Sequence, residues 1–217
     1  MQATHPSQVS PSAARDVRVV LFDVGGVLVQ LSGVATILEW MGHRITAEEL
    51  GPLWLRSPSV RAFETGRLEP LDFAVGMVAE LKLDLPPQRF LDAFTAWPTG
   101  LYPGALETIA RIPRRYTRAV LSNSNSLHWS LVMNEMRLGP AFDHHFSSHL
   151  IGKIKPDAEA FHHVLESLGC NAYEVLFLDD NLLNVDAARA LGMHAVVVRG
   201  ATEAGLALKQ AGVIAGD

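Results

Sequence analysis

The chain has 217 residues, a formal net charge of −5 and 48% hydrophobic residues, enough for one buried core and a small second module. It carries no basic stripe that would favour nucleic-acid binding, and its single cysteine, Cys170, excludes an internal disulfide. No apolar run reaches the roughly 18–20 residues that a membrane span needs. We therefore expect a soluble cytoplasmic protein, and the sequence leaves both a monomer and a homodimer open.

The chain begins with a polar stretch, residues 1–16, in which Ser, Pro and Ala are scattered and the apolar region of a signal peptide is missing. We expect a disordered tail there. Next comes Val17–Phe22, an almost continuous apolar run that is typical of strands buried on both faces of a parallel sheet. The same pattern returns in three later segments, which are Arg118–Leu121, Val175–Leu178 and His194–Val198.

Helical patterns accompany the later strands. They cover Ala105–Arg111, Ser126–Met136, Asp157–Leu168 and Asn184–Leu191. Pro156 precedes the third of these segments and Gly169 follows it, as is usual where a helix starts and ends. The alternation of strands and helices predicts an α/β fold with a doubly wound, Rossmann-like parallel sheet.

The segment 32–98 breaks this alternation because it shows no clear strand. Amphipathic helical patterns occupy Val34–Met41, Ala47–Leu55, Leu71–Leu81 and Pro87–Phe94. We predict a helical cap over residues 32–98, with residues 17–31 and 99–217 forming the α/β core. Open α/β sheets bind ligands beyond the carboxyl ends of their strands, so helices inserted after the first strand can act as a lid.

Polar residues follow the predicted core strands in four places. They are Asp23 with Gly25 and Gly26, Ser122 with Asn123, Lys155 before Pro156, and Asp179 with Asp180. A carboxylate at a strand tip is held by a rigid sheet, and the glycine turn after Asp23 leaves it open to a ligand. The adjacent acids Asp179 and Asp180 repel each other, and a bound cation explains their pairing better than a helix cap does.

These residue types suit phosphoryl transfer. Asp23 can attack phosphorus and form an aspartyl-phosphate. Magnesium prefers carboxylate and water oxygens, which Asp179 and Asp180 can supply. Donors near the phosphoryl oxygens stabilise the transition state. The candidate donors are Lys155, Ser122 and Asn123, with Lys153 as the alternative to Lys155.

In this order the motifs resemble those of the haloacid dehalogenase-like hydrolase superfamily, from about Arg18 to Arg199. The first motif is Asp23-x-Gly25-Gly26-Val27-Leu28, and the other three are Ser122, Lys155-Pro156 and Asp179-Asp180. The family also inserts its cap helices after the first motif. Within the family, the glycine pair and the cap segment Phe63-Glu64-Thr65-Gly66 are similar to the glucose-1-phosphate phosphatase branch.

The resemblance implies a magnesium-dependent phosphatase acting on a small phosphorylated metabolite. Asp23 would be the nucleophile and a magnesium ligand, and Gly25 would add its backbone carbonyl. Asp180 would be the direct ligand of the acidic pair, with Asp179 close by. Lys155 would be catalytic. The residues expected to bind phosphate are Ser122, Asn123 and Gly26.

One position departs from the pattern of the family. Most of its phosphatases carry a second aspartate two residues after the nucleophile, which protonates the leaving oxygen. Gly25 stands there and has no side chain. We therefore expect a substrate whose leaving group departs readily, such as a sugar 1-phosphate. Otherwise an ordered water or a cap residue must replace the acid, and His43 and Glu64 are the candidates.

Three other functions stay open. A carbon–halogen hydrolase also uses an aspartate nucleophile, but it has an aromatic residue at the position of Gly25 and does not need the pair Asp179-Asp180. Phosphonate cleavage requires a lysine in the cap, where only Lys82 occurs. A non-catalytic member of the fold would explain the missing acid. The histidines, including His144 and His145, match no zinc signature and are read as ordinary side chains.

Overall fold

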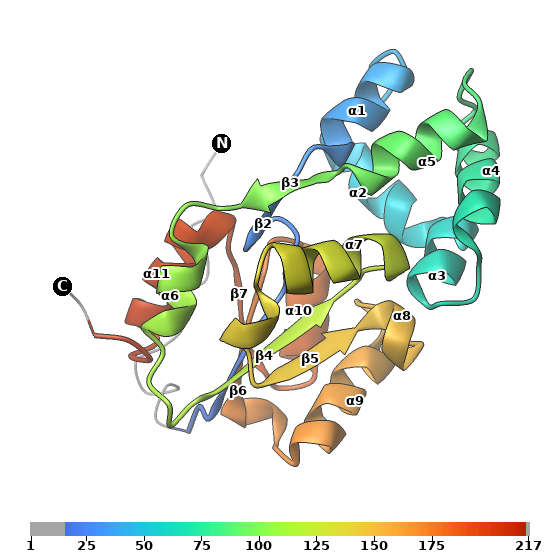
Figure 1. Cartoon of the computed structure of the whole chain (residues 1–217). Helices are drawn as coiled ribbons and strands as arrows, with labels where there is room; N and C mark the ends of the chain where they lie inside the picture. Colours follow the sequence, from blue (N-terminus) through green and yellow to red (C-terminus); the bar gives the residue numbers. More distant parts are fainter. Residues whose placement is uncertain (1–15, 216–217) are drawn as a thin grey trace, which may run out of the picture.

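The computed structural model describes residues 16–215. The tail predicted for residues 1–16 therefore lies outside the described residues, apart from Asp16. Two parts stand out in Figure 1, an α/β core and a group of helices that projects from it, shown in blue to green at the upper right. No helix in the described part combines the length and hydropathy of a membrane span.

The core is built on one sheet of five parallel strands in the order β5-β4-β1-β6-β7. These strands are β1 (Val19–Phe22), β4 (Thr117–Ser122), β5 (His144–Ser147), β6 (Val175–Asp179) and β7 (His194–Val197). The four predicted strands are confirmed. The sequence missed β5 because it is an edge strand whose exposed residues His144 and His145 hide the apolar pattern.

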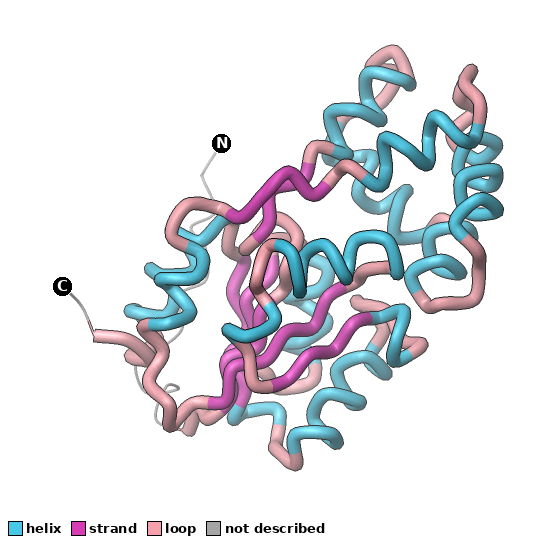
Figure 2. The backbone as a smooth tube through the Cα atoms, in the orientation of Figure 1, coloured by secondary structure: helices cyan, strands magenta, loops and turns pink. Residues whose placement is uncertain are grey.

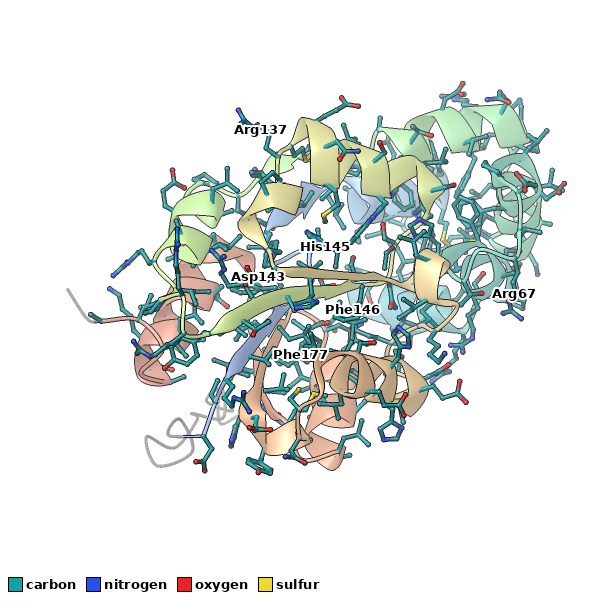
Figure 3. All side chains as sticks on the ribbon, turned by 60° about the horizontal axis from the view of Figure 1, so that its bottom comes forward. Arg67, Arg137, Asp143, His145, Phe146 and Phe177 are labelled. Carbon is teal, nitrogen blue, oxygen red and sulfur yellow. The ribbon has the colours of Figure 1, made fainter. Side chains whose placement is uncertain are left out.

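Helices cover both faces of the sheet, so the predicted doubly wound fold is confirmed. One face carries α6 (Ala105–Ala110), α7 (Ser126–Ser130) with the π-helical turn Leu131–Glu135, and α11 (Gly200–Gln210); the other carries α9 (Ala158–Leu168) and α10 (Leu182–Ala190). Successive strand residues alternate between the faces. Val20 and Phe22 pack on the first side, while Val19 and Leu21 pack on the second. Figure 3 labels Phe177, which meets α9 on that second side.

The projecting helices form the helical insertion, by which we mean α1 to α5. They are α1 (Gly33–Trp40), α2 (Ala47–Arg56), α3 (Pro58–Glu64), α4 (Pro70–Glu80) and α5 (Pro87–Thr95). Four of the five match the sequence prediction, and α3 was missed. Its start does carry a sequence signal, because Ser57 caps the backbone N–H of Val60 and Pro58 occupies the first position of the helix.

The insertion joins the core through a short antiparallel pair, β2 (Val29–Leu31) and β3 (Pro98–Leu101). Figure 2 shows this pair between the strands of the core and the helices of the insertion. At its outer end Gly33 packs against Trp97 so closely that a Cβ atom on Gly33 would lie 2.3 Å from the Trp97 ring. Three short helical turns complete the fold: α8 (Ser148–Ile151), Gly139–Ala141 and Ala172–Glu174.

Candidate active site

Asp23 stands directly after the central strand β1 and is only 7% exposed. Its backbone N–H donates to the carbonyl of Leu178 on the neighbouring strand β6, at 2.8 Å. The position of the side chain is thus set by two adjacent strands of the sheet. Its carboxylate oxygen Oδ1 accepts a hydrogen bond from Lys155 Nζ at 2.6 Å.

Lys155 links two strand ends, because its ammonium also donates to Asp179 Oδ2 at 2.7 Å. The side chain is 1% exposed. Burial by itself would lower the pKa of Lys155, but the carboxylates of Asp179 and Asp23 raise it, so the group stays charged. Lys153 is half-buried, and no ion pair joins it to the site among the described residues. The structure therefore places Lys155 there, and not the alternative.

Asp179 and Asp180 have different surroundings. Asp179 is fully buried, and besides Lys155 it accepts hydrogen bonds from the backbone N–H of Asn181 at 2.8 Å and from Asn184 Nδ2 at 3.1 and 3.0 Å. Its oxygens are thus occupied by protein donors. Asp180 is half-buried and has no such set of partners in the described part of the chain. Asp180 is therefore the more accessible of the two carboxylates.

The carboxylates of Asp23, Asp179 and Asp180 each offer an oxygen, and these oxygens lie within 4.8 Å of one another. Burial raises the pKa of Asp23 to about 7 even though Lys155 lowers it, and burial together with Asp179 raises the pKa of Asp180 to about 6. The negative charge of Asp179 thus disfavours the ionisation of both Asp23 and Asp180. A divalent cation relieves this repulsion, and an all-oxygen donor set fits magnesium.

Comparison with known proteins agrees with this arrangement. A family model described as haloacid dehalogenase-like hydrolase matches residues 17–192. The chain belongs to the haloacid dehalogenase-like hydrolases. The match covers all the strand-end residues discussed above, and it identifies the protein as a hydrolase.

Individual relatives include phosphatases. The chain is 30% identical over 182 residues to a sesquiterpene phosphatase, astK, of Aspergillus oryzae, which covers 81% of this chain and 87% of the relative. It is 26% identical over 191 residues to phosphoglycolate phosphatase 1 of Pseudomonas aeruginosa, covering 84% of this chain and 69% of that protein. A haloacid dehalogenase family enzyme of Bacteroides thetaiotaomicron, solved with magnesium and inorganic phosphate, shares the fold with a TM-score of 0.65 and 21% identity, covering 84% and 94% of the two chains.

Gly26 brings the first motif of this hydrolase against the fourth. Its φ is +74°, and a Cβ atom there would lie 2.1 Å from Asp180 Oδ2. Its backbone N–H donates to Val29 at 2.9 Å, and its carbonyl accepts from Gly200 at 2.8 Å. The phosphate-binding role expected for Gly26 thus lacks a free backbone donor in this structure. Gly26 is needed because only a residue without a side chain lets Asp180 approach.

Asn123 also differs from the sequence prediction. Its side-chain amide donates to the carbonyl of Lys155 and accepts from the backbone N–H of Lys155, both at 2.9 Å. The amide that was expected to bind phosphate therefore positions the lysine. Ser122 is 4% exposed, and its hydroxyl makes only a long contact of 3.4 Å with the Asn123 carbonyl. The Ser122 hydroxyl therefore remains a candidate phosphate donor.

Sequence reasoning missed Asn184. It lies in the first turn of α10 and is 5% exposed, and its amide holds Asp179 as described above. A polar residue on the buried side of an otherwise apolar helix face was the available signal. Asn184 therefore keeps the orientation of Asp179 fixed.

The nearest side chain to Gly25 is apolar. A Cβ atom on Gly25 would lie 2.8 Å from Leu31 Cδ1, and Leu31 is 50% exposed. A leucine thus flanks the position that carries an aspartate in most phosphatases of the family. Of the two proposed substitutes, His43 is exposed in the loop after α1, which Figure 1 shows far from the sheet. Glu64 is buried at the end of α3.

Proposed function

We propose that this hydrolase is a magnesium-dependent phosphatase that cleaves a small phosphorylated metabolite through an aspartyl-phosphate on Asp23. One observation carries the proposal: a buried lysine bridges Asp23 and Asp179, while the half-buried Asp180 completes a group of three carboxylates. A nucleophile, a fixed positive charge and a cation site therefore converge at one edge of the sheet. Phosphoryl transfer requires these three elements together.

Each residue of the site has a separate role in the proposed cleavage of the phosphate ester. Asp23 attacks phosphorus, and Lys155 offsets the negative charge that accumulates when one anion approaches another. The Ser122 hydroxyl donates to a phosphoryl oxygen. Asp23, Asp180 and the Gly25 carbonyl would hold magnesium, which supplies positive charge to the phosphoryl oxygens when it is bound. Asp179 acts through Lys155, because it keeps the ammonium in place.

For the substrate, the missing acid at Gly25 supports an ester with a good leaving group, and a sugar 1-phosphate fits because the anomeric oxygen leaves readily. A second class is supported by apolar side chains near the strand ends. Leu31 lies beside Gly25, and Leu182 and Leu183 begin α10 directly after the acidic pair; they are 50%, 55% and 47% exposed. Together with the relative named a sesquiterpene phosphatase, they favour a monophosphate of an apolar alcohol.

The test begins with 4-nitrophenyl phosphate, assayed with magnesium and with a chelator. We expect hydrolysis that needs magnesium and falls by about 10⁴-fold or more in Asp23→Asn, because the variant loses the attacking carboxylate. Circular dichroism checks that the variant is folded. Halide release from a 2-haloacid without metal would instead support a dehalogenase. Inactivity on every phosphate and haloacid would support a non-catalytic member of the family.

A substrate panel then separates the two classes. It contains glucose 1-phosphate, glucose 6-phosphate and farnesyl phosphate, each assayed for kcat/KM. A preference for the 1-phosphate over the 6-phosphate supports the sugar hypothesis, and a preference for farnesyl phosphate supports the apolar class. Equal, slow turnover of all three would contradict both substrate assignments while leaving the phosphatase proposal intact.

A further inference from the structure

Glu64 is a buried carboxyl of the helical insertion whose pKa responds to the charges of the site. It is the last residue of α3 and is 7% exposed. The Trp54 side chain and the charge of Lys155 lower the pKa of its carboxyl, whereas burial and the charge of Asp23 raise it. The carboxyl therefore lies between the aromatic interior of the insertion and the charged edge of the sheet.

Contacts on either side of Glu64 hold the end of α3 against the core. Gly66, with φ +72°, packs so closely on α8 that a Cβ atom would lie 2.6 Å from the carbonyl oxygen of His149. Arg61 forms an ion pair with Asp157, two residues after Lys155. These contacts place the end of α3, where Glu64 lies, against α8 and beside the loop that carries Lys155.

The core residues around the site are already occupied by hydrogen bonds to one another. We therefore look for the acid that protonates the leaving group outside the core. Gly25 has no side chain, the oxygens of Asp179 are occupied, and Lys155 is engaged by two carboxylates. His43, the other candidate, is exposed. Glu64 is a buried carboxyl at the end of α3, next to the segment that packs on α8, and no ion pair joins it to Lys155 among the described residues.

We propose that Glu64 is the catalytic acid and base of the reaction, supplied by the insertion in place of the aspartate that Gly25 replaces. This inference rests on the proposed phosphatase function and adds a residue to it. With this acid the enzyme no longer requires the activated leaving group that the absence of a side chain at Gly25 would otherwise favour. Simple alkyl and isoprenoid phosphates then become substrates together with sugar 1-phosphates.

The proton transfers balance over two steps. First, an oxygen of Asp23 bonds to phosphorus while the bond from phosphorus to the ester oxygen breaks. The electron pair stays on the ester oxygen, which takes the proton of Glu64 and leaves as an alcohol. Second, a water oxygen bonds to phosphorus and gives a proton to the Glu64 carboxylate. The bond from phosphorus to Asp23 then breaks, its electron pair returns to the carboxylate, and inorganic phosphate leaves.

The protonation state of Glu64 agrees with this role. Burial raises the pKa of its carboxyl from 4.5 to about 8, although the Trp54 hydrogen bond and the charge of Lys155 act to lower it. The raised pKa favours the protonated form, which is the form that the first step requires. A catalytic acid works best when its pKa lies near the working pH.

The experiment measures kcat/KM of the full chain with magnesium on substituted phenyl phosphates and on benzyl phosphate. We expect Glu64→Gln to lower the value for benzyl phosphate, a poor leaving group, by about 10²–10⁴-fold, and that for 4-nitrophenyl phosphate by less than about tenfold. The plot of log kcat/KM against the pKa of the leaving alcohol becomes steeper. An unchanged slope, or an equal loss on every substrate, would overturn the assignment.

Two further variants serve as controls for the change in slope. Glu69→Gln changes an exposed carboxylate of the same insertion and should leave the slope as in the wild type. Glu64→Asp keeps an acid at a shorter reach, so its slope should fall between those of the wild type and Glu64→Gln. If Glu64→Gln does not fold, Glu64→Asp is used to test the proposal. A slope equal to that of the wild type in Glu64→Asp then counts against it. Activity that survives in Asp23→Asn would instead refute the phosphatase mechanism itself.

Discussion

At the edge of the sheet, Lys155 forms hydrogen bonds with both Asp23 and Asp179, whereas in the helical insertion the Glu64 carboxyl is buried next to a cluster of aromatic side chains. Lys155 is held by two carboxylates and by the Asn123 amide. In the insertion, aromatic rings such as Phe63 and Phe73, with centroids 4.4 Å apart, provide the packing. Hydrogen bonds thus hold the side chains at the strand ends, whereas aromatic packing holds the helices of the insertion together.

The difference has a functional meaning. The strand ends carry the groups that we propose act on the phosphate, and their hydrogen bonds leave them little freedom. The insertion contacts the core through a few points, including Gly66 on α8 and His128, whose ring nitrogen lies 2.7 Å from the Phe94 carbonyl oxygen. Residues of the insertion can therefore change without disturbing the hydrogen bonds at the strand ends.

The largest effect on this comparison is expected from Lys155→Met. The change leaves Asp23 and Asp179 buried without their cation, and loss of one partner of a buried ion pair costs about 3–5 kcal/mol. Urea unfolding of the metal-free protein measures the loss. Lys153→Met is the matched control and should change the free energy of unfolding by less than about 0.5 kcal/mol. Similar losses in the two variants would mean that the bridge does not organise the sheet edge.

A smaller effect is expected from Gly26→Ala. The new Cβ atom would collide with Asp180, and overpacking of this kind costs about 1–3 kcal/mol. Gly104→Ala is the control, because Gly104 has a similar φ of +80° but no atom within 4 Å of the place that a Cβ would take. Both variants place an alanine at a positive φ and carry the same backbone strain. The difference between their free energies of unfolding therefore measures the collision with Asp180. Calorimetric titration should show weaker magnesium binding only in Gly26→Ala.

The smallest effect, counted per unit of pH, concerns the insertion and its response to pH. Because the pKa of Glu64 is about 8 in the folded state and ordinarily 4.5, the folded protein binds the extra proton between these values. Its contribution to stability is complete below pH 4.5 and is lost as the pH rises through 8, by at most about 1.4 kcal/mol per pH unit. Lys155 and Asp23 are the charged groups that act on Glu64.

Glu64→Gln removes this titration. Thermal melts of the metal-free protein between pH 5 and 8 should therefore show the variant gaining stability relative to the wild type as the pH rises. Glu69→Gln should follow the wild type throughout, since Glu69 is exposed. A constant difference between Glu64→Gln and the wild type across this range would show that the carboxyl does not bind a proton on folding.

The sequence by itself determined the main sheet and the order of the site residues. Apolar runs buried on both faces identify β1, β4, β6 and β7, and a charged residue after such a run marks a strand end. Asp23, Lys155 and Asp180 could be found in this way because each lies next to a recognisable strand or helix signal. The edge strand β5 and helix α3 were not predicted, because neither has an apolar pattern long enough to be recognised in the sequence.

Only the tertiary structure decided which neighbours these residues have. It selected Lys155 over Lys153 by burying one ammonium between two carboxylates, engaged Asn123 with the lysine backbone, and set Gly26 against Asp180. It also placed Glu64 of the insertion beside the core loop. The physical reason is that local sequence patterns report burial and periodicity, whereas hydrogen bonds and charge pairs depend on residues that the chain brings together from distant elements.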